Sequence, residues 1–343
     1  MIPATALDGQ MPAWRRELVS AVTDPAVLIK LLELPPELLE PARLAARQFG
    51  LRVPRSYLDL MEPGNPHDPL LRQVLPIADE MWETPGFGDD PLDEQASTTA
   101  GGLVEKYQGR ALLLASGHCA LHCRYCFRRS FPYAGFNVAG RDAEEEALAR
   151  LAERSDLQEI ILSGGDPLAL DDGRLAQLVQ RLDRIPHLRR LRIHTRLPIA
   201  IPSRVTDELC TLLAQTRLAP VLVVHCNHPQ ELAPDRTQAL ARLRTIGVTL
   251  FNQSVLLAGV NDNLSTLVEL AERLFDSGVI PYYIHMLDRV RGAAHFEVPE
   301  SRAVALQGGL RQRLPGYLVP RLVREVAGAP SKLPMDCLDP VLE

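Results

Sequence analysis

The chain has 343 residues, of which 46% are hydrophobic and 23% charged, and a formal net charge of −6. This is the composition of a globular protein large enough for one large domain or two ordinary ones. No basic region marks a nucleic-acid footprint, no apolar run approaches the ~20 residues that cross a bilayer, and no secretory signal precedes residue 30, so we expect a cytoplasmic protein without nucleic-acid or membrane partners.

The first third of the chain differs from the rest. Residues 1–105 are rich in proline and mainly helical in pattern, with breaks at 62–66 and 86–91. We interpret them as a helical N-terminal region that packs on the following domain.

Short apolar, β-branched runs follow at 111–115, 159–162, 191–194, 221–226, 249–255 and 281–286. After the first interval they start roughly 30 residues apart, the size of one βα unit, with helix-period segments such as 144–153, 173–182 and 264–274 between them. A further extended run covers 317–323. This alternation predicts an α/β fold with a parallel sheet, either doubly wound or a partial barrel.

Polar residues directly after successive runs favour the barrel, because a barrel-type active site collects residues from the carboxyl ends of its strands. We therefore predict a partial (β/α)6-type barrel over residues 106–316. Residues 317–343 form a C-terminal segment.

Three cysteines follow the first predicted strand with the spacing C-x3-C-x2-C, namely Cys119, Cys123 and Cys126. Four thiolates would close a zinc site or fully ligate an iron–sulfur cube, whereas three leave one iron of a four-iron cluster open. A zinc site with His118 or His122 as fourth ligand, in a protein without catalysis, is the alternative. Disulfides are not expected, because the other cysteines are scattered.

With Tyr125 before the last cysteine, this segment resembles the radical S-adenosylmethionine superfamily. The resemblance implies a 4Fe–4S cluster on the three cysteines, whose open iron binds S-adenosylmethionine. It also implies that the loop Gly164-Gly165-Asp166-Pro167, after the second predicted strand, contacts the amino group of the methionine moiety. A simple tight turn is the alternative for this loop, since glycines also serve there.

The chain further resembles the lysine 2,3-aminomutase family over roughly residues 65–340, which combines such a cluster with pyridoxal 5′-phosphate bound by a loop lysine. The matching segments are His67–Val74, the cysteine segment through Arg129, Leu162–Leu168, His225–Glu231, Asn252–Asp262, Pro281–Asp288 and the loop around Lys332.

Lysine is rare in this chain, at Lys30, Lys106 and Lys332 only, and arginine cannot replace it in forming an imine. The resemblance implies that Lys332 forms the imine with pyridoxal phosphate. Lys106 is the next candidate, because Lys30 falls on the solvent side of a predicted helix. By the same resemblance Arg110 lies near the cofactor phosphate, and Gln253 is among the residues on the S-adenosylmethionine side.

The substrate contacts implied by the family are Arg128 for the carboxylate of lysine and Asp288 for its distal ammonium. The alternatives are a solvated charge for Arg128 and a surface ion pair with Arg289 or Arg291 for Asp288. The family's second aspartate corresponds to Glu325, seven residues before Lys332, which we take as the candidate for that contact.

The resemblance implies a radical isomerase that converts L-α-lysine to (R)-β-lysine by 2,3-amino migration, with a reducing partner such as flavodoxin or ferredoxin. Short members with His285, the segment 293–296 and a Pro-Ser-Lys loop resemble the enzymes that make (R)-β-lysine to modify elongation factor P, which implies a link to that factor and its lysyl-transferring ligase. A free-standing lysine or glutamate 2,3-aminomutase is the alternative. Asp288 favours lysine, because a glutamate enzyme needs no acidic partner for a distal ammonium.

Overall fold

The computed structural model describes residues 11–99, 101–136 and 140–335, so Cys337 lies outside the described residues. One nine-stranded sheet dominates it, with the strands in chain order from β1 to β9. Strands β2 to β8 pair in parallel, whereas β1 and β9 pair antiparallel at the two edges. The edges do not pair with each other, so the barrel stays open, as predicted. The strands are β1 Leu103–Tyr107, β2 Arg110–Ser116, β3 Glu159–Gly164, β4 Arg190–Thr195, β5 Ala219–Val224, β6 Thr249–Val255, β7 Ile280–His285, β8 Arg321–Arg324 and β9 Leu333–Pro334.

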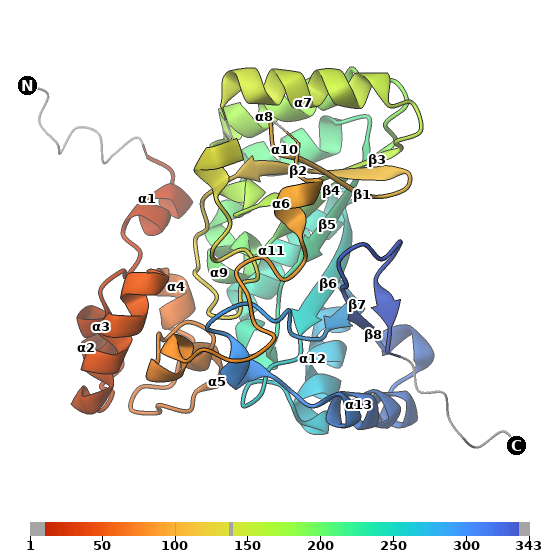
Figure 1. Ribbon diagram of the computed structural model, residues 1–343. Coiled ribbons are helices and arrows are strands. Elements are labelled where there is room, and N and C mark those ends of the chain that lie inside the picture. Colours follow the sequence, from red (N-terminus) through yellow and green to blue (C-terminus); the bar gives the residue numbers. More distant parts are fainter. Residues whose placement is uncertain (1–10, 100, 137–139, 336–343) are drawn as a thin grey trace, which may run out of the picture.

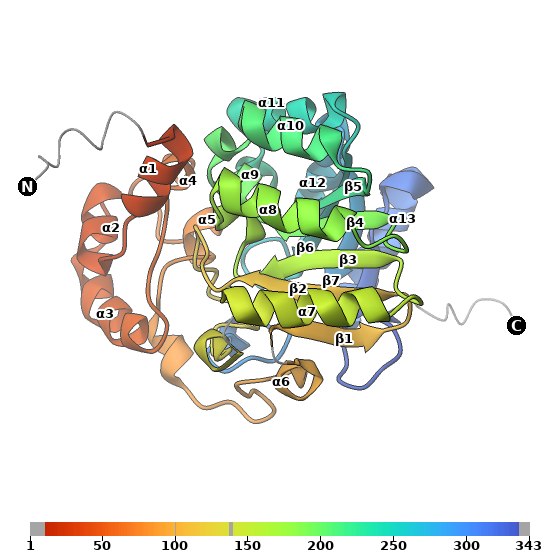
Figure 2. The same cartoon turned by 90° about the horizontal axis from the view of Figure 1, so that it is seen from above.

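Helices cover the outside of the curved sheet, as Figures 1 and 2 show. The longer ones are α7 Arg141–Glu153, α8 Asp172–Asp183, α10 Asp207–Gln215, α11 Pro234–Thr245, α12 Leu264–Asp276 and α13 Glu300–Arg313. Short turns of helix connect strands to them, at α9 Leu197–Ala200, η4 Tyr133–Phe136, η5 Pro167–Ala169, η6 Pro202–Arg204, η7 Pro229–Glu231, η8 Ala294–Phe296 and η9 Gly316–Leu318. Each predicted helix lies within one of these, at α7, α8 and α12.

Local sequence explains where these helices begin and which side they bury. In α12, Asn263 caps the first turn by accepting a hydrogen bond from the Thr266 amide at 2.9 Å. The residues buried along α12 are Leu267, Leu270, Ala271 and Leu274, a spacing that forms one apolar stripe facing the sheet. Burying each leucine contributes about 1.5–3 kcal/mol.

The N-terminal region consists of short helices that lie beside the barrel, at the red and orange end of the chain in Figure 1. They are α1 Ala13–Val19, α2 Pro25–Leu31, η2 Pro36–Leu38, α3 Leu39–Gln48, α4 Arg55–Leu58, α5 Pro69–Arg72, η3 Ala78–Met81 and α6 Glu94–Ser97. Lys30 is exposed on α2, as expected. The predicted boundary at residue 105 falls inside β1, and the division of the chain into three regions remains a prediction. Within the described residues no helix has the length and apolarity to span a bilayer.

Two features of the sheet differ from the sequence-based expectation. The extended run expected at 317–323 is a turn of 3₁₀ helix at η9 followed by β8, which adds a seventh parallel strand. The antiparallel strands β1 and β9 were not predicted. Their 5 and 2 residues are too short to show a period, and partners rather than sequence define them.

Along strands such as β4, apolar side chains that face the helices alternate with polar side chains that face the inside of the barrel. In β4, Leu191 and Ile193 are buried against the helices, whereas Arg192 and His194 line a cavity inside the barrel. In β6, Leu250 is likewise buried in the core and Gln253 lines the cavity. Because side chains alternate between the two faces of a strand, the same strands build both the core and the site.

Candidate active site

All the residues that the sequence predicted for the site line one cavity of about 770 Å³ inside the open barrel. They come from the carboxyl ends of several strands and from the two edges of the sheet. They are Arg110, Cys119, Cys123, Cys126, Arg128, Gly164, Gly165, Asp166, Gln253, Asp288, Glu325 and Lys332. The contacts made by each define what the cavity can hold.

The three cysteines lie on the segment 117–129 after β2, which we call the cysteine loop. All three thiols are free and partly exposed to the cavity. Burial raises the pKa of Cys119 well above its usual value and that of Cys126 to about 11. Without metal the thiols of Cys119 and Cys126 are therefore protonated, and a bound iron–sulfur cluster would have to displace their protons. Three thiols facing one cavity fit such a cluster.

The zinc alternative finds less support in this geometry. His122 Nδ1 is hydrogen-bonded to the Gly50 carbonyl at 2.8 Å, and the ring stacks on Phe49. Within the described ranges, no three His, Cys, Asp or Glu side chains converge as ligands of a single metal ion. The cysteines of a cluster bind separate iron atoms and do not need to converge on one point.

The loop after β3 packs directly against the start of the cysteine loop. The amides of Gly165 and Asp166 donate to the carbonyls of Ser116 and His118 at 2.6 and 2.7 Å. A Cβ on Gly164, whose φ is +116°, would lie 2.4 Å from the Ser116 carbonyl, and one on Gly165 would lie 2.4 Å from that of His118. Both glycines are therefore required by this close approach of two backbones.

Asp166 fixes this loop with its side chain. One oxygen accepts from the Thr195 hydroxyl at 2.7 Å and the Leu168 amide at 3.0 Å. The other accepts from the amides of Arg196 and Leu197 at 2.7 and 3.2 Å. With four hydrogen bonds inside the chain, the carboxylate has little acceptor capacity left for a ligand. The loop carbonyls of Gly164 and Asp166 also accept hydrogen bonds within the chain, from Arg128 Nη1 at 3.3 Å and from the Ala169 amide at 3.0 Å.

Arg128 is buried, at 8% exposure, rather than solvated. Its guanidinium forms a bidentate ion pair with Glu94 of α6, at 2.6 and 3.0 Å, and Nη1 also donates to the Ser163 hydroxyl at 3.0 Å. Burial opposes the ionisation of Glu94, but the charge of Arg128 outweighs it and lowers the pKa of that carboxyl. A substrate carboxylate would have to share Arg128 with Glu94.

Lys332 lies on the segment 325–334, which follows β8 and includes β9, and which we call the lysine loop. Its ammonium is paired with Glu325, which also accepts from the Tyr107 hydroxyl at 3.2 Å. Lys106 lies 3.9 Å from Glu325 and 3.3 Å from Glu94. Carboxylates and cations thus alternate from Arg128 through Glu94, Lys106 and Glu325 to Lys332.

Asp288 follows β7 and lines the cavity, so the surface ion pair considered for it is wrong. Arg289 pairs instead with Glu297, and Arg291 with Glu83 and Asp89. Removal from bulk water, and then the nearby charge of Glu325, raise the pKa of Asp288 to about 7. A cation from a ligand would lower this pKa and stabilise the ionised carboxylate.

Polar groups without partners inside the barrel indicate where ligand atoms fit. His194 Nε2 and His285 Nε2 are buried with no hydrogen-bond partner among the described residues. Gln253 Nε2 lies 2.9 Å from His225 Nε2. Burial lowers the pKa of these three histidines, to about 3 for His225, so they are neutral. Neutral rings with free nitrogens are suited to hydrogen bonds with a polar ligand.

Arginines provide positive charge elsewhere in the cavity. Arg110 begins β2, Arg321 begins β8, and Arg192 lies in β4 between them in the sheet, and all three line the cavity. Guanidinium groups of this kind fit a phosphate. With Lys332 in the same cavity, the residues present fit pyridoxal phosphate.

Sequence reasoning missed several residues that this cavity brings together. Glu94 lies in the N-terminal region and carries no motif, because only tertiary packing places it beside Arg128. Arg192 gave a weak signal as a charged residue inside a strand. Arg196 gave a stronger one, since it directly follows β4, in the position where the other site residues were found.

The chain is similar to known proteins over most of its length. Residues 113–274 match the family model described as the Radical SAM superfamily. The chain is 51% identical over 324 residues to the L-lysine 2,3-aminomutase of Escherichia coli (strain K12), covering 94% of each chain. It is 47% identical to that of Haemophilus influenzae, covering 93% of this chain and 94% of the relative. A radical SAM methyltransferase from Sphaerobacter thermophilus overlaps it with a TM-score of 0.43 and 19% identity, covering 65% of this chain and 68% of that one.

Proposed function

Because the chain belongs to the L-lysine 2,3-aminomutase family of the radical SAM superfamily, we propose that it is an isomerase that moves the amino group of L-lysine from C2 to C3. Membership implies a 4Fe–4S cluster, S-adenosylmethionine and pyridoxal phosphate as cofactors. One observation carries the proposal for this chain. The three thiols and Lys332 line a single cavity, so radical chemistry and amine chemistry share one enclosure.

The residues proposed to hold the cofactors follow from the family resemblance, and all of them line the cavity. Cys119, Cys123 and Cys126 would hold the cluster, Lys332 would bind pyridoxal phosphate, and Arg110 would face its phosphate. When bound, the cluster and S-adenosylmethionine supply a radical able to remove an unactivated hydrogen, and pyridoxal phosphate supplies a π-system through which the amino group moves. The protein's own part is to position these groups and to keep water out of the barrel.

The carboxylates of the cavity support lysine as substrate. Arg128 is assigned to the substrate carboxylate, with Glu94 as the internal anion that it replaces or shares. Asp288 and Glu325 are assigned to the distal ammonium. The carboxylates of Asp288 and Glu325 suit a substrate with a second positive charge, whereas the second carboxylate of glutamate would be repelled by Asp288.

An anaerobic assay tests this proposal. The protein is supplied with a one-electron reductant, S-adenosylmethionine, pyridoxal phosphate and either lysine or glutamate, and the β-amino acids are quantified. We expect β-lysine. Formation of β-glutamate without β-lysine would overturn the substrate assignment, and a colourless, oxygen-stable protein that binds zinc would overturn the reaction class.

We further propose that the product is (R)-β-lysine for the modification of elongation factor P, with flavodoxin or ferredoxin as the reductant in the cytoplasm. The resemblance of the segment 293–296 and of the Pro-Ser-Lys loop to such enzymes supports this role, and thiol ligands for a cluster need a reducing compartment. The product would be offered to the lysyl-transferring ligase and elongation factor P. The test incubates the product with the ligase and elongation factor P and measures the mass of the factor. An increase by one β-lysyl group supports the role, and an unchanged mass contradicts it.

A further inference from the structure

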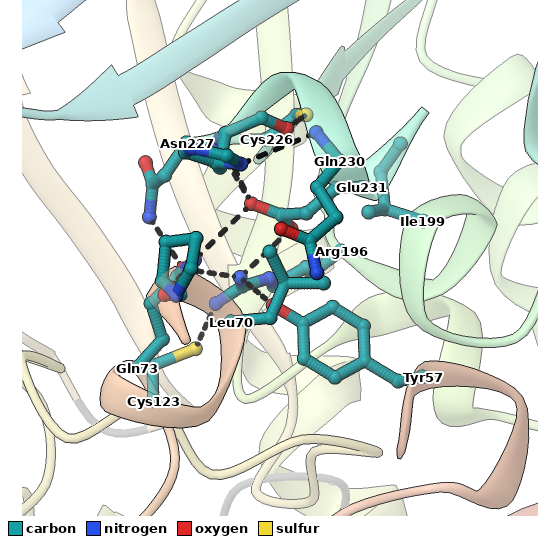
Figure 3. A network of polar contacts seen from close by, with 12 residues as sticks. Tyr57, Leu70, Gln73, Cys123, Arg196, Ile199, Cys226, Asn227, Gln230 and Glu231 are labelled. Carbon is teal, nitrogen blue, oxygen red and sulfur yellow. Dashed lines mark hydrogen bonds and ion pairs between the residues drawn. The ribbon is translucent and has the colours of Figure 1, made fainter. Parts of the chain in front are cut away.

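A buried network of polar side chains ends at one of the cysteines, and the proposed function does not use it. At its centre is Arg196, which directly follows β4 and is 7% exposed. Its Nη2 donates to the Tyr57 hydroxyl at 3.0 Å, Gln73 Oε1 at 2.6 Å and Glu231 Oε2 at 2.9 Å. Figure 3 shows the guanidinium between these three residues and Cys123.

The other terminal nitrogen of Arg196 points to the cysteine loop. Nη1 lies 2.7 Å from Cys123 Sγ and 2.6 Å from the hydroxyl of Tyr125, the aromatic residue of the cysteine motif. Thus Nη2 donates to buried side chains outside the cysteine loop, and Nη1 donates to two residues of the cysteine loop. A guanidinium keeps its charge and its planar geometry, so it presents this N–H in a fixed direction.

The network around Arg196 is rigid and electrically balanced. Glu231 is fully buried, pairs with Arg196, and accepts hydrogen bonds from the amides of Asn227 and His228 at 2.9 and 3.1 Å. Asn227 Nδ2 also donates to Gln73 Oε1 and to the Tyr125 hydroxyl, at 2.9 and 2.6 Å. The cost of burying one arginine is thus offset by Glu231, and the position of Nη1 is determined from several sides.

We propose that Arg196 is a positioning residue for the iron–sulfur cluster, which donates a hydrogen bond to the sulfur of Cys123 and thereby raises the reduction potential of the cluster. The inference rests on the proposed cluster site. Reduction by one electron from an external donor adds negative charge to the cluster and its thiolates. A buried positive donor beside a ligand sulfur stabilises that added charge, and burial of Arg196 at 7% exposure weakens screening by solvent.

The experiment measures the midpoint potential of the reconstituted protein without S-adenosylmethionine, by anaerobic titration followed by electron paramagnetic resonance. Arg196→Gln removes the charge, and Arg196→Lys keeps a charge without the fork. We expect the equilibrium for reduction to fall at least about tenfold in Arg196→Gln, about 59 mV more negative for one electron, and less in Arg196→Lys. Iron content should stay at the wild-type level.

Tyr57→Phe is the matched control, because it removes one buried partner of Nη2 and leaves the contact with Cys123 intact. It should lower the stability of the network, by less than Arg196→Gln does because Glu231 keeps its partner, and leave the potential unchanged. A merely structural role for Arg196 predicts the same potential in all variants with full iron content, and that result would overturn the inference. Loss of the cluster from both Arg196 variants, with retention in Tyr57→Phe, would also overturn it in favour of a role in assembly.

Two further outcomes distinguish this inference from a role of Arg196 in binding S-adenosylmethionine and from failure of the proposed function. If the variants need more S-adenosylmethionine for its spectral effect while the potential is unchanged, Arg196 serves that ligand, and the inference is wrong. If the wild-type protein takes up no cluster, the proposed function itself fails. A wild-type cluster with an unshifted potential in the Arg196 variants contradicts only the inference on Arg196.

Discussion

The cysteine loop and the lysine loop face the same cavity but are held in opposite ways. The cysteine loop is fixed by buried charges and backbone contacts: Glu80 pairs with Arg124 and Arg129, and the Arg124 amide donates to the Gln73 carbonyl at 2.9 Å. The lysine loop is largely exposed and is held by the two-residue strand β9 and the pair of Lys332 with Glu325. The difference indicates that buried contacts fix the positions of the proposed cluster ligands. The role proposed for Lys332 depends instead on its amine, which no other side chain of the lysine loop provides.

The largest expected effect separates chemistry from stability at the lysine loop. Lys332→Ala should abolish activity and the absorbance of the lysine-bound cofactor, because no arginine can take its place. Since the side chain is partly exposed, the free energy of unfolding should change by less than about 1 kcal/mol. Cofactor absorbance and iron content are measured together, and Lys30→Ala on the exposed side of α2 is the control. Persistent cofactor absorbance would make Lys106 the binding lysine.

At the cysteine loop we expect a large loss of stability, in contrast to the small loss expected for Lys332→Ala. Glu80→Gln leaves Arg124 and Arg129 without their buried counter-charge, since Glu80 and Arg124 are 1% and 0% exposed. We expect the free energy of unfolding to fall by about 3–5 kcal/mol and cluster occupancy to fall with it. Urea unfolding measures this, with Glu145→Gln in an exposed pair as a control that changes it by less than about 1 kcal/mol. Equal effects of the two substitutions would contradict a fixed cysteine loop.

A substitution of Asp288, which lines the same cavity, tests whether this residue binds the distal ammonium of the substrate. Asp288→Asn removes the anion but keeps the size, and loss of one partner of a buried charge pair costs about 2–5 kcal/mol. We expect kcat/KM for lysine to fall at least about 30-fold while cluster and pyridoxal phosphate stay bound. Steady-state kinetics check this, with Glu297→Gln as the neighbouring surface control. An unchanged kcat/KM would remove Asp288 from the substrate site.

The smallest expected effect is a pH dependence with a defined sign. The pKa of Asp288 is raised to about 7, so its carboxyl is neutral below that pH and binds an ammonium less well. The kcat/KM for lysine should therefore rise with pH through about 7, by up to tenfold per unit below it. Between the ordinary pKa of an aspartate and 7 the folded state binds the extra proton, so the contribution of Asp288 to stability decreases as pH rises. Asp288→Asn should flatten this limb of the profile, and a variant that keeps it would assign the limb to another group.

The sequence predicted the parts of the site that follow strands, because the order of strands in a barrel brings their carboxyl ends together. Cys119, Asp166 and Asp288 are of this kind, and Gln253 lies near the carboxyl end of β6. It did not predict Glu94, which lines the cavity from the N-terminal region, or Tyr57 and Gln73, which contact Arg196 from the same region. Their positions depend on packing between segments that lie about 35 to 140 residues apart, as for Arg128 with Glu94 and Arg196 with Tyr57, and no local period records such contacts.

The polar network around Arg196 and the short edge strands were missed for related reasons. Arg196 follows β4 in a position that indicated chemistry, but its partners could be identified only in the folded chain. Strand β9 has 2 residues and exists only because β8 offers it a partner. Residues that act through a distant partner therefore need the structure, whereas motif residues do not.

The central claim is that the cysteines and Lys332 serve one reaction in one cavity. The most direct measurement supplies lysine deuterated at C3, together with S-adenosylmethionine, pyridoxal phosphate and a reductant, and follows deuterium by mass spectrometry. The account predicts β-lysine and deuterium in the adenosyl group of S-adenosylmethionine or of its cleavage product. Formation of β-lysine with no deuterium in the adenosyl group, or no β-lysine from protein with full cluster and cofactor, would contradict it.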